Sequence, residues 1–235
     1  MKTDTLNRRS RFAPPQPVDA AIILQERDYL IFETLDRHGK LPTPYLHEFT
    51  KHAGRNYKHL QLRLTQLYNG YCDELGHRAQ IASHVCKPTS YLARDLQQFN
   101  NFQARYQPAV YGIAPAAKHL LLAAGRGTTH SPVRNDPFVH QLFGACFSAS
   151  IERAAKPHRF ITGEEILQHA KCPESTRMAP NPFALPVSDP DIKHIIPDNL
   201  FGIEYDRGGF RFFAVEIDRN TESINPRKPV KNSKR

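Results

Sequence analysis

Three acidic residues stand at the ends of two strands that the C-terminal part of the sequence predicts. Asp198 follows Pro197 at the start of one strand, and Glu216 and Asp218 lie near the end of the next. Acidic side chains are poor strand formers and are costly to bury, so this placement indicates a functional use. Carboxylates held together can bind Mg²⁺ or Mn²⁺, or act as general bases. Because Pro-Asp also opens ordinary turns, a solvated turn is the alternative reading.

A β-hairpin is the element that must position these carboxylates. Residues 206–209, Asp-Arg-Gly-Gly, predict the turn between its two strands. Side chains on one face of a strand repeat every two residues, so Glu216 and Asp218 should share a face, with Asp198 on the neighbouring strand. We therefore take Asp198, Glu216 and Asp218 as candidate metal ligands and, for a nuclease, as candidate catalytic residues.

The charge of the chain is unevenly distributed. The net charge is +9, yet residues 37–134 hold 13 Lys and Arg against 4 Asp and Glu, whereas residues 141–222 hold 9 against 12. Residues 1–25 predict a basic flexible arm, and residues 225–235 a basic disordered tail. A basic part followed by a mildly acidic one is typical of a protein whose first half binds a polyanion. The alternative is a basic surface without a partner.

Several classes of protein are disfavoured by composition. No run of about 18 apolar residues predicts a membrane span, and no apolar segment of a secretory signal follows the basic N-terminus. The scattered cysteines fit a reducing cytoplasm better than a disulfide framework. Cys72, His77, His84 and Cys86 carry side chains that can bind zinc, but their spacing matches no known zinc module, so the sequence does not favour a zinc site.

The first half of the sequence predicts three short helices, over residues 26–39, about 42–52 and about 56–69. A tight turn at residues 53–54 precedes the third. In that third helix Leu60, Leu64, Leu67 and Tyr71 form one apolar stripe. Three helices with a turn before the third are the arrangement of a helix-turn-helix. A small helical bundle with a polar outer face is the alternative.

The face of the third helix opposite the apolar stripe carries residue types that read DNA. Arg55, Lys58, His59, Leu62 and Gln66 project there, and they offer donors for bases, cations for phosphates and one apolar side chain. We therefore expect double-stranded DNA as the partner, with a homodimer as a further expectation. The candidate DNA-binding residues are Arg55, Asn56, Lys58, His59, Arg63, Gln66, Lys87 and Arg94.

The remaining residues predict the helices, strands and loops that surround the acidic cluster and the DNA-binding helix. A return strand is expected at residues 110–113 and a helix at about 114–125, after a long insertion that contains a helical patch at 91–102. A polar connector at 125–136 marks a domain boundary. A helix to about Ala155 follows and carries Glu152 near its end. Thr162 predicts an N-cap for a helix that begins with two glutamates. Residues 173–190, with five prolines, predict a loop.

Taken together, these pieces resemble the replication-relaxation proteins of plasmids and other mobile elements. The matching segments are RLTQLY at 63–68, AVYGI at 109–113, IPD at 196–198 and FAVEIDRNTE at 213–222. The resemblance implies an α+β chain with a winged helix-turn-helix at residues 26–125. It also implies a small domain at 136–224, similar to the restriction-endonuclease-like fold whose metal site is written PD-(D/E)xK. The implied role is DNA binding in replication, relaxation or transcriptional control.

One departure from the nuclease pattern bears on activity. Asp218 stands where the pattern has Lys, and Arg219 is one residue out of register and so on the opposite face of the strand. The basic tail also stands where the nuclease fold continues with a covering helix, so we expect a truncated version of that fold. DNA binding is the first hypothesis, and a Mg²⁺- or Mn²⁺-dependent nuclease that uses Asp198 and Glu216 is the alternative. A protein-interaction module with a degenerate nuclease-like half is the third.

Overall fold

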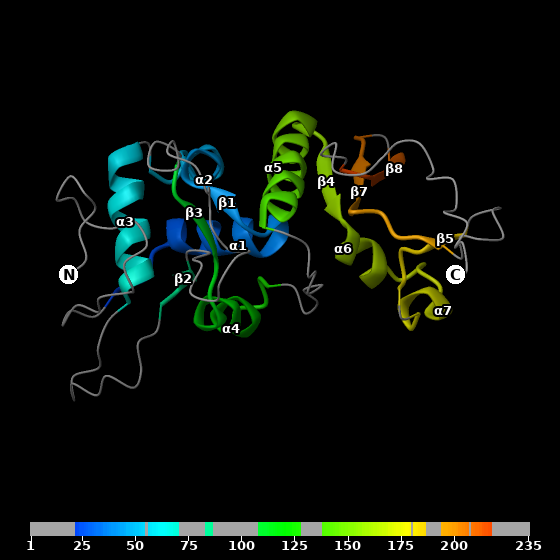
Figure 1. Ribbon diagram of the computed structural model, residues 1–235, viewed down its shortest axis with the longest axis horizontal. Coiled ribbons are helices and arrows are strands. Elements are labelled where there is room, and N and C mark those ends of the chain that lie inside the picture. The colour runs from blue at the N-terminus through cyan, green and yellow to red at the C-terminus, as the bar shows by residue number, and fades with distance from the viewer. Residues whose placement is uncertain are drawn as a thin grey trace, which may run out of the picture.

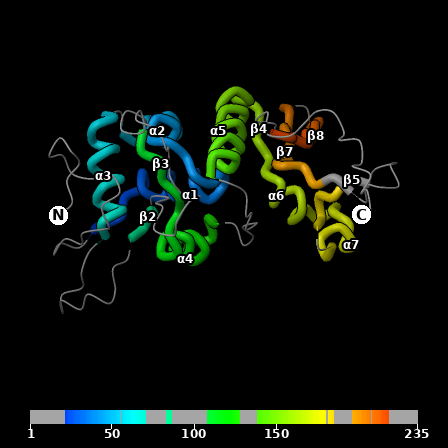
Figure 2. Tube along the Cα trace, in the orientation of Figure 1, coloured from blue at the N-terminus to red at the C-terminus, as the bar shows by residue number. Residues whose placement is uncertain are grey.

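The computed structural model describes residues 22–54, 56–70, 83–86, 108–127, 138–179, 181–186, 194–206 and 208–217. Within these ranges the chain is of mixed α+β class, as predicted, with two three-stranded sheets and one two-stranded sheet. Helix α3 (Tyr57–Asn69) lies at one end of the molecule and α5 (Phe138–Ala155) in the middle (Figure 1). The chain runs from the blue half to the orange C-terminal sheet at the other end (Figure 2).

The first half of the molecule, residues 22–127, confirms the predicted helices and the strand at 110–113. Strand β3 is central, and β1 and β2 pair with it antiparallel on its two sides, with Leu41 opposite Tyr111 and Val85 opposite Ile113. The elements described in this half, besides α3, are α1 (Glu26–His38), β1 (Leu41–Pro42), α2 (Thr43–Thr50), β2 (Val85–Cys86), β3 (Val110–Ile113) and α4 (Pro115–Ala123).

Local signals set the ends of the helices. Gly39 and Gly70 follow α1 and α3 with φ angles of 91° and 69°, a region that glycine enters without steric cost. The Asn56 side chain accepts hydrogen bonds from the backbone N–H groups of Lys58 and His59, and so caps α3. These caps fix where α3 begins and therefore which of its residues face outward.

The core of the first half is built on the apolar stripe of α3. Leu60, Leu64 and Leu67 are all 0% exposed, and they belong to the same buried cluster as Ile31 and Phe32 of α1. The stripe was predicted correctly as far as it is described, since Tyr71 lies outside the described residues. Burial of this stripe fixes the rotation of α3 about its axis and turns its polar face to solvent.

Helix α5 joins the two halves. Its Ala145 and Ala149 are buried in the core cluster of the first half. The same helix packs against β4 (Arg159–Thr162) and β7 (Asn199–Glu204) of the C-terminal sheet. The helix that sequence analysis assigns to the second domain therefore shares the core of the first, and it fastens the C-terminal sheet to that core.

The C-terminal sheet has the antiparallel order β4-β7-β8, where β8 spans Phe210–Val215. Strands β7 and β8 form the predicted hairpin around residues 206–209. The predicted cap at Thr162 is confirmed, because its hydroxyl accepts from the Glu165 N–H in a reciprocal capping box. This box opens α6 (Gly163–Gln168).

The prediction of a continuous loop at 173–190 was wrong. The segment contains α7 (Glu174–Arg177) and β5 (Leu185–Pro186), which pairs with β6 (His194–Ile195). A four-residue helix and a two-residue strand are too short to show apolar periodicity, so a proline-rich sequence conceals them.

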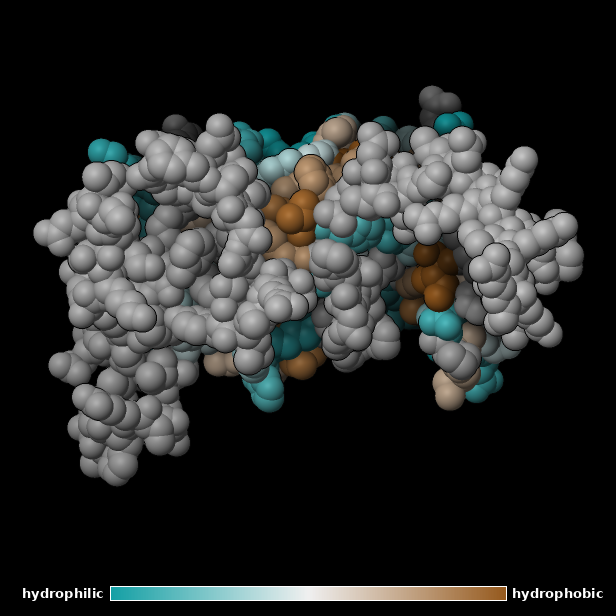
Figure 3. Space-filling model, in the orientation of Figure 1, coloured by the Kyte–Doolittle hydropathy of each residue, from teal (hydrophilic) through white to brown (hydrophobic). Residues whose placement is uncertain are grey.

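Exposed aromatic side chains gather in the second half of the molecule. Phe143 and Phe147 on α5 are 56% and 43% exposed, and apolar atoms cluster over the middle of the molecule in Figure 3. Phe210 and Phe212 on the edge strand β8 are also exposed. None of the described helices is long and apolar enough to cross a membrane.

Candidate nucleic-acid interface

The outer face of α3 is exposed along its length. Lys58, His59, Leu62 and Gln66 are all exposed, and Leu62 retains 64% of its accessible surface. Neither Lys58 nor His59 uses its side chain in a hydrogen bond or ion pair with the described residues. Helix α3, which lies at one end of the molecule in Figure 1, thus presents a cation, an imidazole, an amide and an apolar side chain to solvent.

Asn56 and Arg63, two of the candidate residues, are committed to holding the fold. The Asn56 carboxamide oxygen lies 2.9 Å from the backbone nitrogen of Lys58, as the cap of α3. The Arg63 guanidinium donates to both carboxylate oxygens of Asp28, at 2.9 and 2.6 Å, and to the backbone oxygen of Ile23 at 2.7 Å. The hydrogen bonds to Asp28 raise the pKa of Arg63 above its ordinary value.

The pairing of Arg63 with Asp28 ties α3 to the start of α1. Asp28 is 0% exposed, and its side chain also accepts from the backbone N–H of Gln25 in the cap of α1. A buried carboxylate with three donors needs its arginine, because removal of one partner leaves an unpaired buried charge. Arg55, Lys87 and Arg94, the other candidate cations, lie outside the described residues.

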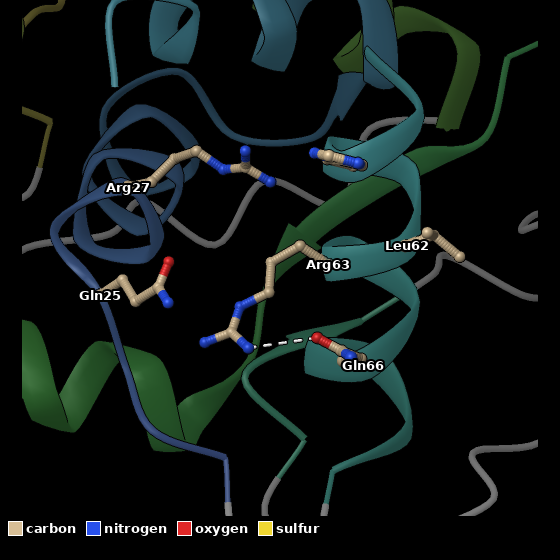
Figure 4. Close-up of a pocket in the computed structure, with 6 residues that line it drawn as sticks. Gln25, Arg27, Leu62, Arg63 and Gln66 are labelled. Atoms are coloured by element: carbon tan, nitrogen blue, oxygen red, sulfur yellow. Dashed lines mark hydrogen bonds between the residues drawn. The ribbon is translucent and has the colours of Figure 1, made fainter. Parts of the chain in front are cut away.

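An open pocket of about 320 Å³ lies between α1 and α3. Figure 4 shows Gln25 and Arg27 on the α1 side of it, facing Arg63 and Gln66 on α3, with Leu62 pointing away. The sequence did not single out Arg27. A helical projection would place it on the polar side of α1, but its position beside the turn that precedes α3 depends on how the two helices pack.

The two described acidic candidates lie at the same end of the C-terminal hairpin. Asn199 pairs with Val215, so Asp198 and Glu216 adjoin each other at the point where β7 begins and β8 ends. The Asp198 carboxylate accepts from the backbone N–H of Ile217 at 2.7 Å. Its other oxygen lies 2.8 Å from Nε2 of His140 on α5. Through these two hydrogen bonds Asp198, at the start of β7, connects that strand to α5 and to the end of β8.

His140 is a site residue that the sequence alone did not indicate, since nothing in the chain marks it as a neighbour of Asp198. Among the described residues no group of three or more His, Cys, Asp and Glu could hold a metal ion. Asp218, Cys72 and His77 lie outside those residues. His84 is a core residue whose ring stacks on Phe32, with 5.8 Å between centroids.

Glu152 points its carboxylate toward α1. One carboxylate oxygen lies 2.6 Å from Nε2 of His38, and the other 2.5 Å from the Arg37 guanidinium. The Glu152 side chain is 13% exposed and that of His38 is 0% exposed. Glu152, near the end of α5, thus connects α5 to α1 and joins the two halves of the molecule.

Comparisons of this chain with protein-family models, with curated proteins and with solved structures found no match.

Proposed function

We propose that this protein binds double-stranded DNA through the exposed face of α3. The observation that carries the proposal is the division of α3 into two faces. Leu60, Leu64 and Leu67 are fully buried, whereas Lys58 and His59 project from the other side and form no side-chain hydrogen bond or ion pair in the described part of the chain. A cationic helix face of this kind suits the major groove, where donors read bases and cations neutralise phosphates.

The order of the elements supports a winged helix-turn-helix. Helices α2 and α3 are separated by a short turn, and β2 and β3 follow α3 as an antiparallel pair completed by β1. In such a domain the third helix enters the groove while the strand pair lies beside it. Residues 87–107, which connect β2 to β3 in the sequence, lie outside the described residues.

The proposed biological setting is the replication, relaxation or transcriptional control of a plasmid or other mobile element. It is supported by the sequence segments that resemble replication-relaxation proteins, together with the basic charge of residues 37–134. A homodimer would suit this setting, because symmetric helix-turn-helix proteins bind paired half-sites one helical turn apart. Sedimentation equilibrium in the presence and absence of duplex DNA tests the dimer.

The experiment that tests DNA binding is an electrophoretic mobility assay with duplex DNA over a range of salt concentrations. Affinity should fall about tenfold or more between 50 and 200 mM salt, since phosphate contacts release counterions. Lys58→Ala should weaken binding, whereas Lys171→Ala, which removes the same charge from an exposed position in the second half, should not. Equal affinity of the two variants would place the contact elsewhere on the molecule.

A metal-dependent DNA nuclease is the second candidate function. The register that brings Asp198 and Glu216 to one end of the β7–β8 hairpin favours it. These carboxylates would hold a Mg²⁺ ion, and the cation would supply the positive charge that polarises the phosphodiester and its attacking water. We expect weak or no cleavage, because the lysine of the nuclease pattern is replaced by Asp218.

A supercoiled plasmid incubated with Mg²⁺, Mn²⁺ or EDTA separates the two functions. Nicking that requires metal and is lost in Asp198→Ala would make the protein an enzyme. The thermal midpoint gives a second readout, since a bound cation stabilises the folded state. Equal midpoints in Mg²⁺ and EDTA, without nicking, would leave DNA binding as the function.

A further inference from the structure

The two arginines of the pocket between α1 and α3 differ in how their charge is balanced. Arg63 is paired with Asp28, and its side chain is 17% exposed. Arg27 forms no ion pair or hydrogen bond with its side chain among the described residues. Glu26, its neighbour in α1, is paired with Arg126. Both acidic residues beside Arg27 in the first turn of α1 are therefore committed to other cations.

The Arg27 side chain crosses from α1 to the turn that precedes α3. Its Cδ lies 3.0 Å from where a Cβ would stand on Gly54, and that Cβ would collide with the guanidinium. Gly54, which has no Cβ, thus leaves room for the Arg27 guanidinium beside the turn that precedes α3. Figure 4 shows the Arg27 side chain extending from α1 toward α3. Arg27 and His59 line the same pocket, so a positive charge stands at the edge of the exposed face of α3.

We propose that Arg27 binds a backbone phosphate of duplex DNA in this pocket, as the α1 arm of a clamp whose other arm is the face of α3. The inference rests on the proposed function and adds a contact site on a second helix. A guanidinium can donate two parallel hydrogen bonds to one phosphodiester, which a lysine cannot do. Such a contact fixes the register of α3 in the groove and carries no sequence preference of its own.

The test is the affinity of the full chain for duplexes of unrelated sequence, measured by fluorescence anisotropy across a salt series. Arg27→Ala should weaken binding about tenfold for every duplex and lower the slope of log affinity against log salt by about 1. Arg27→Lys should recover part of the affinity. The matched control is Arg177→Ala, which removes the same charge from the exposed helix α7.

Gly54→Ala provides an independent variant that keeps the arginine but displaces its guanidinium from the turn. It should lower affinity by less than Arg27→Ala does, because the flexible end of the arginine can move aside, and urea unfolding should show that both variants fold. Equal affinities of Arg27→Ala and Arg177→Ala, in a protein that binds duplex DNA, would overturn this inference alone. Failure of the unaltered protein to bind any duplex would overturn the proposed function and the clamp together.

Discussion

His38 at the end of α1 lies 2.6 Å from Glu152 on α5, from its Nε2 to a carboxylate oxygen, and this contact joins the two halves of the molecule. The other ring nitrogen of His38 lies 2.9 Å from the hydroxyl of Ser148, one turn earlier on α5. The imidazole is enclosed between the rings of Phe49 and Phe160. A histidine with both nitrogens satisfied inside an aromatic enclosure holds α5 in one position on α1.

Removal of this contact should destabilise the whole molecule. Glu152→Ala should lower the free energy of unfolding by roughly 1–3 kcal/mol, because it leaves the buried ring of His38 without one of its two hydrogen-bond partners. The control is Lys51→Ala, whose ammonium group pairs with Glu48 where both side chains are more than 40% exposed. That variant should lose about 1 kcal/mol or less in urea unfolding. Similar losses in the two variants would show that the joint is not buried in solution.

The same carboxylate predicts a dependence of stability on pH. Burial alone would raise the pKa of Glu152, but the hydrogen bond from His38 and the charge of Arg37 hold that pKa below its ordinary value of 4.5. A lowered pKa in the folded state means that the stabilisation is present above pH 4.5 and is lost as the pH falls below it. The difference in unfolding free energy between the unaltered protein and Glu152→Gln should therefore shrink below pH 4.5. A difference that grows with acidity would contradict this assignment.

The two faces of α3 should respond differently to the same substitution. Leu64→Ala should lower the free energy of unfolding by about 2–5 kcal/mol, because the side chain is 0% exposed and leaves a cavity. Leu62→Ala, two residues away and 64% exposed, should change it by about 0.5 kcal/mol or less. Urea unfolding checks both variants. A larger loss at position 62 would mean that α3 is rotated from the described orientation.

In the absence of metal, Asp198 should stabilise the fold through its hydrogen bonds to His140 and to the backbone of Ile217. Asp198→Ala should cost roughly 1–3 kcal/mol, since the backbone N–H of Ile217 loses its acceptor and His140 its partner. Asp206→Ala, in the turn of the same hairpin and with a side chain 75% exposed, is the matched control. Chemical denaturation in EDTA measures both variants. Equal stability of Asp198→Ala and the control would show that these two hydrogen bonds contribute little to the stability of the fold.

The helices of the first half and the C-terminal hairpin could be predicted from the sequence because their signals are local. Leucines at helical spacing, the Asn56 cap and the glycines after α1 and α3 act within a few residues. The Thr162 capping box and the turn at 206–209 are equally local. Short elements such as α7 gave no such signal and were missed.

The partnerships between distant residues were decided by the tertiary structure alone. The pairs Arg63 with Asp28, His140 with Asp198 and His38 with Glu152 are 35, 58 and 114 residues apart in the chain. The sequence does not show whether a charged side chain faces solvent or a buried partner. Its desolvation and its pairing depend on the residues that pack around it in the folded protein. In the folded protein Arg63, a candidate DNA contact, instead forms the ion pair that joins α3 to α1. Arg27, which the sequence did not single out, lies at the edge of the exposed face of α3.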